Sequence, residues 1–74
     1  MNDRNGFVIS DRDRVLRAWE NSLELVRDYK AYSEELKDDK RLSNLFDEFA
    51  KDVAYHASKL LKLLQEYEKE KEKR

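Results

Sequence analysis

Hydrophobic positions recur along this chain at heptad spacing, in two separate stripes. The first stripe contains Val15, Trp19, Ser22, Val26, Tyr29, Ser33 and Leu36. The second stripe contains Leu42, Phe46, Phe49, Val53, His56, Leu60, Leu63 and Tyr67. Because this period places side chains on one side of a helix, the pattern predicts two helices that each bury one face.

The two stripes are out of phase with each other. If the first stripe continued past Leu36, its apolar face would receive Lys40, Ser43 and Asp47. The alternative is one unbroken helix from residue 11 to about residue 70, as in a coiled-coil adaptor. The phase break between residues 37 and 41 favours a chain reversal instead. We therefore predict an all-α fold, an antiparallel two-helix hairpin.

Polar residues mark the expected ends of these helices. Ser10 is a typical N-cap, and Asp13 stands at the capping-box position three residues later. Asp38 or Asp39 can cap the second helix. The expected organisation is an N-terminal arm, a hairpin and a charged helical tail. The arm is 1–9, the hairpin is 10–67 with helices at about 11–37 and 40–67, and the tail is 68–74.

Composition narrows the class of protein. The chain has 74 residues, no cysteine, and 16 basic against 17 acidic residues. This balance lacks the basic excess of a nucleic-acid binder, and no apolar run approaches the length of a membrane span. We therefore expect a cytoplasmic protein that binds neither nucleic acid nor membrane.

The apolar stripes are too wide for a single partner helix. Ala18, Leu25 and Tyr32 widen the first, and Ala50, Ala57 and Leu64 widen the second. A chain this short also has a marginal core of its own. Both features predict a homodimer in which two hairpins form a four-helix bundle. The residues expected to pack in its core and dimer interface are Trp19, Ser22, Val26, Tyr29, Phe46, Phe49, Val53, His56, Leu60 and Leu63.

The only histidine offers the main candidate for chemistry. His56 falls in the second stripe, at about the height of Ser22 in a hairpin. We expect a buried neutral histidine bonded to Ser22 or to its dimer mate. The alternative is a transition-metal site that uses His56 with Asp52, one helical turn earlier, or His56 from both subunits. The sequence carries no Ser/His/Asp triad, phosphate loop or cysteine motif.

Three segments carry a family resemblance. They are Ile9-Ser10-Asp11, Tyr29 two turns after Ser22, and the run from Leu45 through Ala50 into Tyr55-His56-Ala57. From about residue 9 to 64, the chain resembles the ferritin-like superfamily, particularly rubrerythrin-type and spore coat F-like proteins. The resemblance implies a four-helix bundle with a di-iron site.

The iron ligands of that family are mostly missing here. The resemblance places its helix-1 glutamate at Ser22 and its Glu-x-x-His at Val53 and His56, so only the histidine is kept. It implies a half-length member with a degenerate site. We therefore expect a non-enzymatic protein without a cofactor, with a structural or protein-interaction role. A groove near Phe7 and Val8 would receive an unidentified protein partner. The alternative is a metal-binding or redox protein with a non-standard ligand set at His56.

Overall fold

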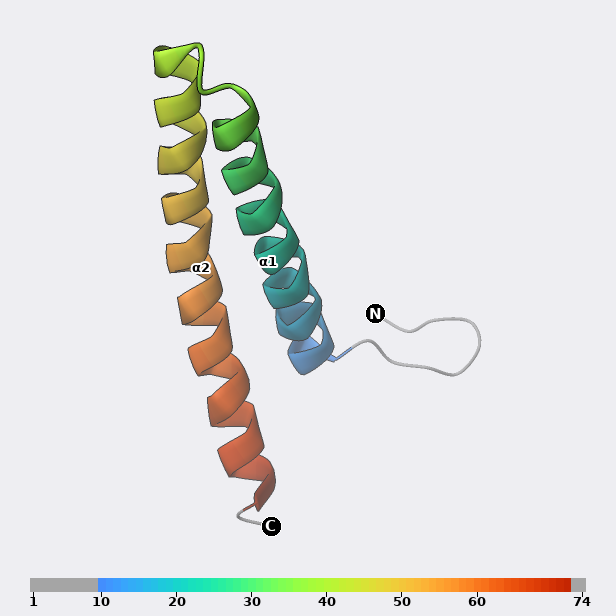
Figure 1. Ribbon diagram of the computed structural model, residues 1–74. Coiled ribbons are helices and arrows are strands. Elements are labelled where there is room, and N and C mark those ends of the chain that lie inside the picture. Colours follow the sequence, from blue (N-terminus) through green and yellow to red (C-terminus); the bar gives the residue numbers. More distant parts are fainter. Residues whose placement is uncertain (1–9, 73–74) are drawn as a thin grey trace, which may run out of the picture.

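The computed structural model describes the backbone of residues 10–72 and the side chains of residues 10–69. Helix α1 (Asp11–Glu35) and helix α2 (Lys40–Glu72) lie side by side and run in opposite directions (Figure 1). The predicted all-α hairpin is confirmed. The expected arm, 1–9, and the last two residues of the expected tail lie outside the described residues. Helix α2 runs without a break past Tyr67 to Glu72.

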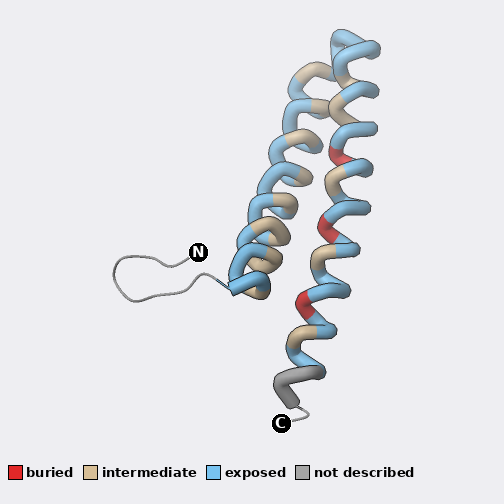
Figure 2. Tube along the Cα trace, turned by 180° about the vertical axis from the view of Figure 1, so that it is seen from behind, coloured by how far each residue is buried: buried red, intermediate tan, exposed pale blue. Residues whose placement is uncertain are grey.

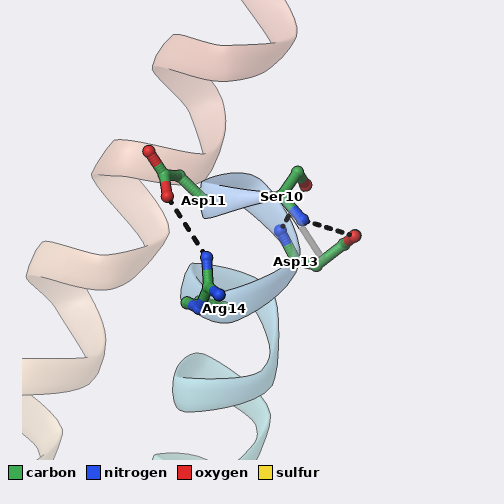
Figure 3. A network of polar contacts seen from close by, with 4 residues as sticks. All are labelled: Ser10, Asp11, Asp13 and Arg14. Atoms are coloured by element: carbon green, nitrogen blue, oxygen red, sulfur yellow. Dashed lines mark hydrogen bonds and ion pairs between the residues drawn. The ribbon is translucent and has the colours of Figure 1, made fainter. Parts of the chain in front are cut away.

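The start of α1 is fixed by the predicted capping box (Figure 3). The backbone N–H of Asp13 donates to Oγ of Ser10 at 3.1 Å, and the N–H of Ser10 donates to Oδ2 of Asp13 at 3.3 Å. These bonds satisfy amide groups that a helix start leaves unpaired. In the same turn, Arg14 Nη1 lies 3.4 Å from Asp11 Oδ1.

The reversal between the helices is short and closed by backbone hydrogen bonds. The N–H of Leu36 donates to Tyr32 O at 2.9 Å, and the N–H of Asp39 donates to Leu36 O at 2.8 Å. Asp39 then caps α2, because its Oδ1 accepts from the N–H of Leu42 at 3.2 Å. The expected reversal between 37 and 41 therefore needs neither glycine nor proline.

Two serines join the helices next to this reversal. Ser33 Oγ donates to Ser43 O, and Ser43 Oγ donates to Ser33 O, each at 2.8 Å. The two hydroxyl oxygens are 3.1 Å apart. At the other end of α1, Arg12 Nη2 lies 2.9 Å from Glu68 Oε2. Because both partners of this ion pair are substantially exposed, it adds little stability, and we expect the serine pair to contribute more.

Replacing Ser33 with alanine should lower the free energy of unfolding by about 1 kcal/mol, since one inter-helix hydrogen bond is lost. Urea denaturation at fixed protein concentration measures this change. Ser58 provides the matched control, because its hydroxyl bonds only within α2, to Tyr55 O, and it is exposed. Ser58→Ala should change stability by less than about 0.5 kcal/mol. Equal losses in the two variants would contradict a stabilising role for the serine pair.

The core of the hairpin is small and lies on one side of α2. Within the described residues, the buried side chains are Ala50, Ala57 and Leu64, with 1%, 5% and 7% of their surface exposed. Figure 2 shows them as three red bands on the side of α2 toward α1, which has no buried residue. Heptad spacing places all three on one line along the helix. The structure is 13 Å thick along its shortest axis, about one helix diameter, so it is a single layer.

Candidate functional site

The residues predicted to pack fall into two groups in the structure. On α1, the whole predicted stripe is half-buried against α2. On α2, only part of the predicted stripe faces α1. The half-buried members of the predicted packing set are Trp19, Ser22, Val26, Tyr29, Phe46, Val53 and Leu60. They lie along the seam between the helices, together with the buried Ala50, Ala57 and Leu64.

The remaining three predicted packing residues are exposed in the hairpin. Phe49 and Leu63 are 39% and 43% exposed, and His56 is also exposed. Phe49 still reaches across to α1, with its ring centroid 5.9 Å from that of Tyr29, but Ala50, Ala57 and Leu64, one position further on, are the buried residues of the seam. Alanine at the seam lets the two backbones approach closely, which a phenylalanine or histidine would prevent. Whether the outer three pack in a dimer stays a prediction.

The expected polar layer between Ser22 and His56 does not form within the hairpin. Ser22 Oγ donates to Ala18 O at 2.8 Å, inside its own helix. The His56 ring lies beside Tyr55, with centroids 6.4 Å apart, and has no hydrogen-bond partner among the described residues. A half-buried serine can satisfy its hydroxyl from the carbonyl one turn earlier, so it needs no histidine across the seam.

Asp52 and His56 lie one turn apart on the exposed side of α2. No group of three or more His, Cys, Asp or Glu side chains that could hold a metal occurs within the described residues. The pair supplies two ligands, whereas a closed zinc site takes four protein ligands and a catalytic one three. Metal binding at His56 would therefore need ligands from outside this hairpin.

An aromatic cluster fills the end of the hairpin nearest the reversal. The Phe46 ring centroid lies 5.8 Å from that of Tyr29, 5.4 Å from that of Tyr32 and 6.0 Å from that of Phe49. The Tyr29 and Phe49 centroids are 5.9 Å apart. Tilted and edge-on ring pairs at such distances are favourable, so this cluster replaces the buried core that α1 lacks. Sequence analysis found these aromatic residues but could not show that they meet.

Apolar side chains also remain exposed on both flanks of the seam. The large ones are Leu23, Leu25, Tyr32, Leu42, Leu45, Phe49, Tyr55, Leu61 and Leu63. Tyr55 is the most exposed at 61%, and the Lys59 ammonium lies 5.1 Å from its ring centroid. Single exposed apolar residues are ordinary, but a contiguous apolar patch on a small protein marks an interaction surface.

Three surface depressions on the described part of the chain are unlike a catalytic cleft. One on α1 is lined by Asp13, Arg14, Leu16, Arg17 and Glu20. Two on α2 are lined by residues between Ser58 and Lys69. Each is lined by one helix alone, so it lacks the convergence of groups from several elements that binding sites usually have.

Neither helix, over its described residues, carries an apolar stretch of the length needed to cross a bilayer. No protein-family model matches this chain, and neither a curated protein nor a solved structure matches it.

Proposed function

We propose that this chain is a non-enzymatic helical hairpin whose two copies form a homodimeric four-helix bundle with a structural or protein-interaction role. The observation that carries the proposal is the small number of buried side chains beside many exposed apolar ones. The described hairpin buries three side chains, all on α2, while nine large apolar residues stay exposed. A single layer of two helices cannot cover both sides of its apolar seam, whereas a second layer can.

The size of the chain supports the same conclusion. A single core in so short a chain supplies only a few kcal/mol of stability unless disulfides, a metal or association add to it. The sequence has no cysteine, and association is the remaining source that its exposed apolar residues can provide. A relationship to ferritin-like proteins is compatible with this proposal, in which two half-length chains rebuild one bundle.

Native mass spectrometry and sedimentation of protein purified without chelator or affinity metal test the proposal. We expect twice the chain mass without metal. We also expect the melting temperature to rise with protein concentration, because association stabilises only the folded chain. A monomer at all concentrations contradicts the homodimer. A dimer with stoichiometric metal that is lost in His56→Ala contradicts the purely structural role and favours metal binding.

A further inference from the structure

The ring contacts show which residues share one flank of the seam. Tyr32 packs against Phe46, and Phe49 packs against Tyr29, so Tyr32 and Phe49 border the seam on the same side. Heptad spacing extends this flank along both helices. We call its central part the uncharged face, and its residues are Ala18, Leu25, Tyr32, Leu42, Phe49, His56 and Leu63. None of them is Asp, Glu, Lys or Arg. Asp11, one heptad before Ala18 at the start of α1, lies beyond the end of this face.

The opposite flank differs in charge. The ion pair between Arg12 and Glu68 lies on this side. Heptad spacing from Glu68 gives the members of this flank on α2, and its members on α1 directly follow the seam residues Val15, Ser22 and Tyr29. Together they are a mixed set of apolar and charged residues. They are Leu16, Leu23 and Lys30 on α1, with Asp47, Ala54, Leu61 and Glu68 on α2. The two flanks are therefore not equivalent, and only the uncharged face, between Ala18 and Tyr32 on α1 and between Leu42 and Leu63 on α2, can be covered without burying a charge.

We propose that the uncharged face is where the second copy docks, about a twofold axis that passes beside Leu25; this inference rests on the proposed homodimer. The axis follows from the spacing of the face. On α1, the three residues of the face are centred on Leu25. On α2, its four residues are centred between Asp52 and Val53. Because Tyr29 lies beside Phe49 in antiparallel helices, Leu25 lies level with Val53. Both rows therefore share one midpoint.

A twofold axis at this midpoint, perpendicular to the helices, gives every residue of the face an apolar or aromatic partner. Leu25 meets Leu25 of the second copy. Ala18 meets Tyr32, so a small side chain faces a large one. Leu42 meets Leu63, and Phe49 meets His56. Such self-complementarity is what an isologous dimer interface requires, and alternation of small and large side chains favours close packing.

Charges along the α1 edge of the face agree with the same axis. Arg14 and Glu35 lie at its two ends, one helical turn from Ala18 and Tyr32 respectively. The axis brings Arg14 of one copy alongside Glu35 of the other, which favours this antiparallel register over a parallel one. On the α2 edge, the axis brings Asp52 of one copy near Asp52 of the other. Both carboxylates lie at the rim of the interface, where water screens their repulsion.

Single cysteines test the axis directly, because the chain has no cysteine of its own. Leu25→Cys places a thiol beside the axis, so mild oxidation should link the dimer through a disulfide. Leu23→Cys is the matched control, since Leu23 and Leu25 are 41% and 40% exposed but lie on opposite flanks. Disulfides need Cα atoms within about 7 Å, so the control should stay unlinked. Linkage of Leu23→Cys as fast as that of Leu25→Cys overturns the proposed face.

A second pair of variants tests the face by dissociation. Leu63→Lys puts a charge on the uncharged face, whereas Leu61→Lys puts one on the other flank at similar exposure, 43% against 38%. We expect Leu63→Lys to raise the dimer dissociation constant by about a hundredfold or more, because two charges enter each interface. Leu61→Lys should change it far less. His56→Leu should strengthen the dimer several-fold, a gain that misfolding cannot mimic.

These results separate the face from the dimer itself. If the wild type is a dimer and Leu63→Lys dimerises equally well, the proposed docking on the uncharged face is wrong but the homodimer is not contradicted. A wild-type chain that stays monomeric in sedimentation overturns both.

Discussion

Replacing Phe46 with alanine should destabilise the protein by about 2–4 kcal/mol. Replacing a fully buried phenylalanine with alanine lowers the free energy of unfolding by about 3–5 kcal/mol. Because Phe46 is half-buried, we expect a slightly smaller loss. Its ring joins Tyr29 and Tyr32 of α1 to Phe49 of α2. The substitution therefore removes the centre of the aromatic cluster, and so large a loss is a major part of the stability of a small domain.

Urea denaturation followed by far-ultraviolet circular dichroism, at one protein concentration, measures this loss. Tyr55→Ala is the control, because Tyr55 is also aromatic and on α2 but is 61% exposed. Its cost should be below about 1 kcal/mol. If Phe46→Ala and Tyr55→Ala unfold at the same urea concentration, the aromatic cluster does not hold the two helices together.

Enlarging Ala50 to leucine should be the other strongly destabilising change, at about 1–3 kcal/mol. Ala50 is 1% exposed and lies at the seam, so added methyl groups must either push the helices apart or adopt strained rotamers. Helix propensity cannot explain a loss, because leucine forms helices almost as well as alanine. The effect therefore reports inter-helix packing alone.

The same substitution at Ala54 separates packing from other effects. Ala54 is one turn further along α2 and is exposed. Ala54→Leu should leave the melting temperature nearly unchanged, whereas Ala50→Leu should lower it by several degrees. A stable Ala50→Leu variant would show that the helices are less closely packed at this point than the structure indicates.

Much of the fold could be predicted from the sequence, because the relevant signals are local. The phase break after Leu36 correctly indicated the reversal, and Ser10 with Asp13 correctly indicated the start of α1. The α1 stripe was also correct, since each of its residues is half-buried. Each of these features depends on spacing within one helix, which the chain displays directly.

The side of α2 that contacts α1 could not be predicted in the same way. Its apolar arc is wide, and large side chains such as Phe49 and Leu63 dominated the stripe, whereas the helix faces α1 with Ala50 and Ala57. A hydrophobic pattern gives the width of an arc but not which part meets the same chain and which part meets another. Alanines at heptad spacing were the available signal, because small residues mark close approach of two helices.

The surroundings of His56 and of the serines could not be predicted for the same reason. The pattern predicts a bond from His56 to Ser22 or to its dimer mate, and the bond to Ser22 does not form, because the rotation of α2 leaves His56 exposed while Ser22 bonds within its own helix. A bond to the dimer mate stays a prediction. The serine pair was missed because hydroxyl groups in a stripe carry no sign of their partners. Only the reversal, which sets the relative height of the helices, brings Ser33 to Ser43.

The serine pair also has a consequence for the order of folding events. Ser33 and Ser43 are only 10 positions apart, and a segment of that length closes on itself in about 10–100 ns. The partners Arg12 and Glu68 are 56 positions apart and must wait until the intervening turns have aligned. The contacts between the two helices should therefore form first next to the reversal and last at the other end, where Arg12 meets Glu68. In the homodimer that we propose, association of two hairpins would follow as a slower, concentration-dependent step, which rapid-mixing kinetics would resolve as a second-order phase.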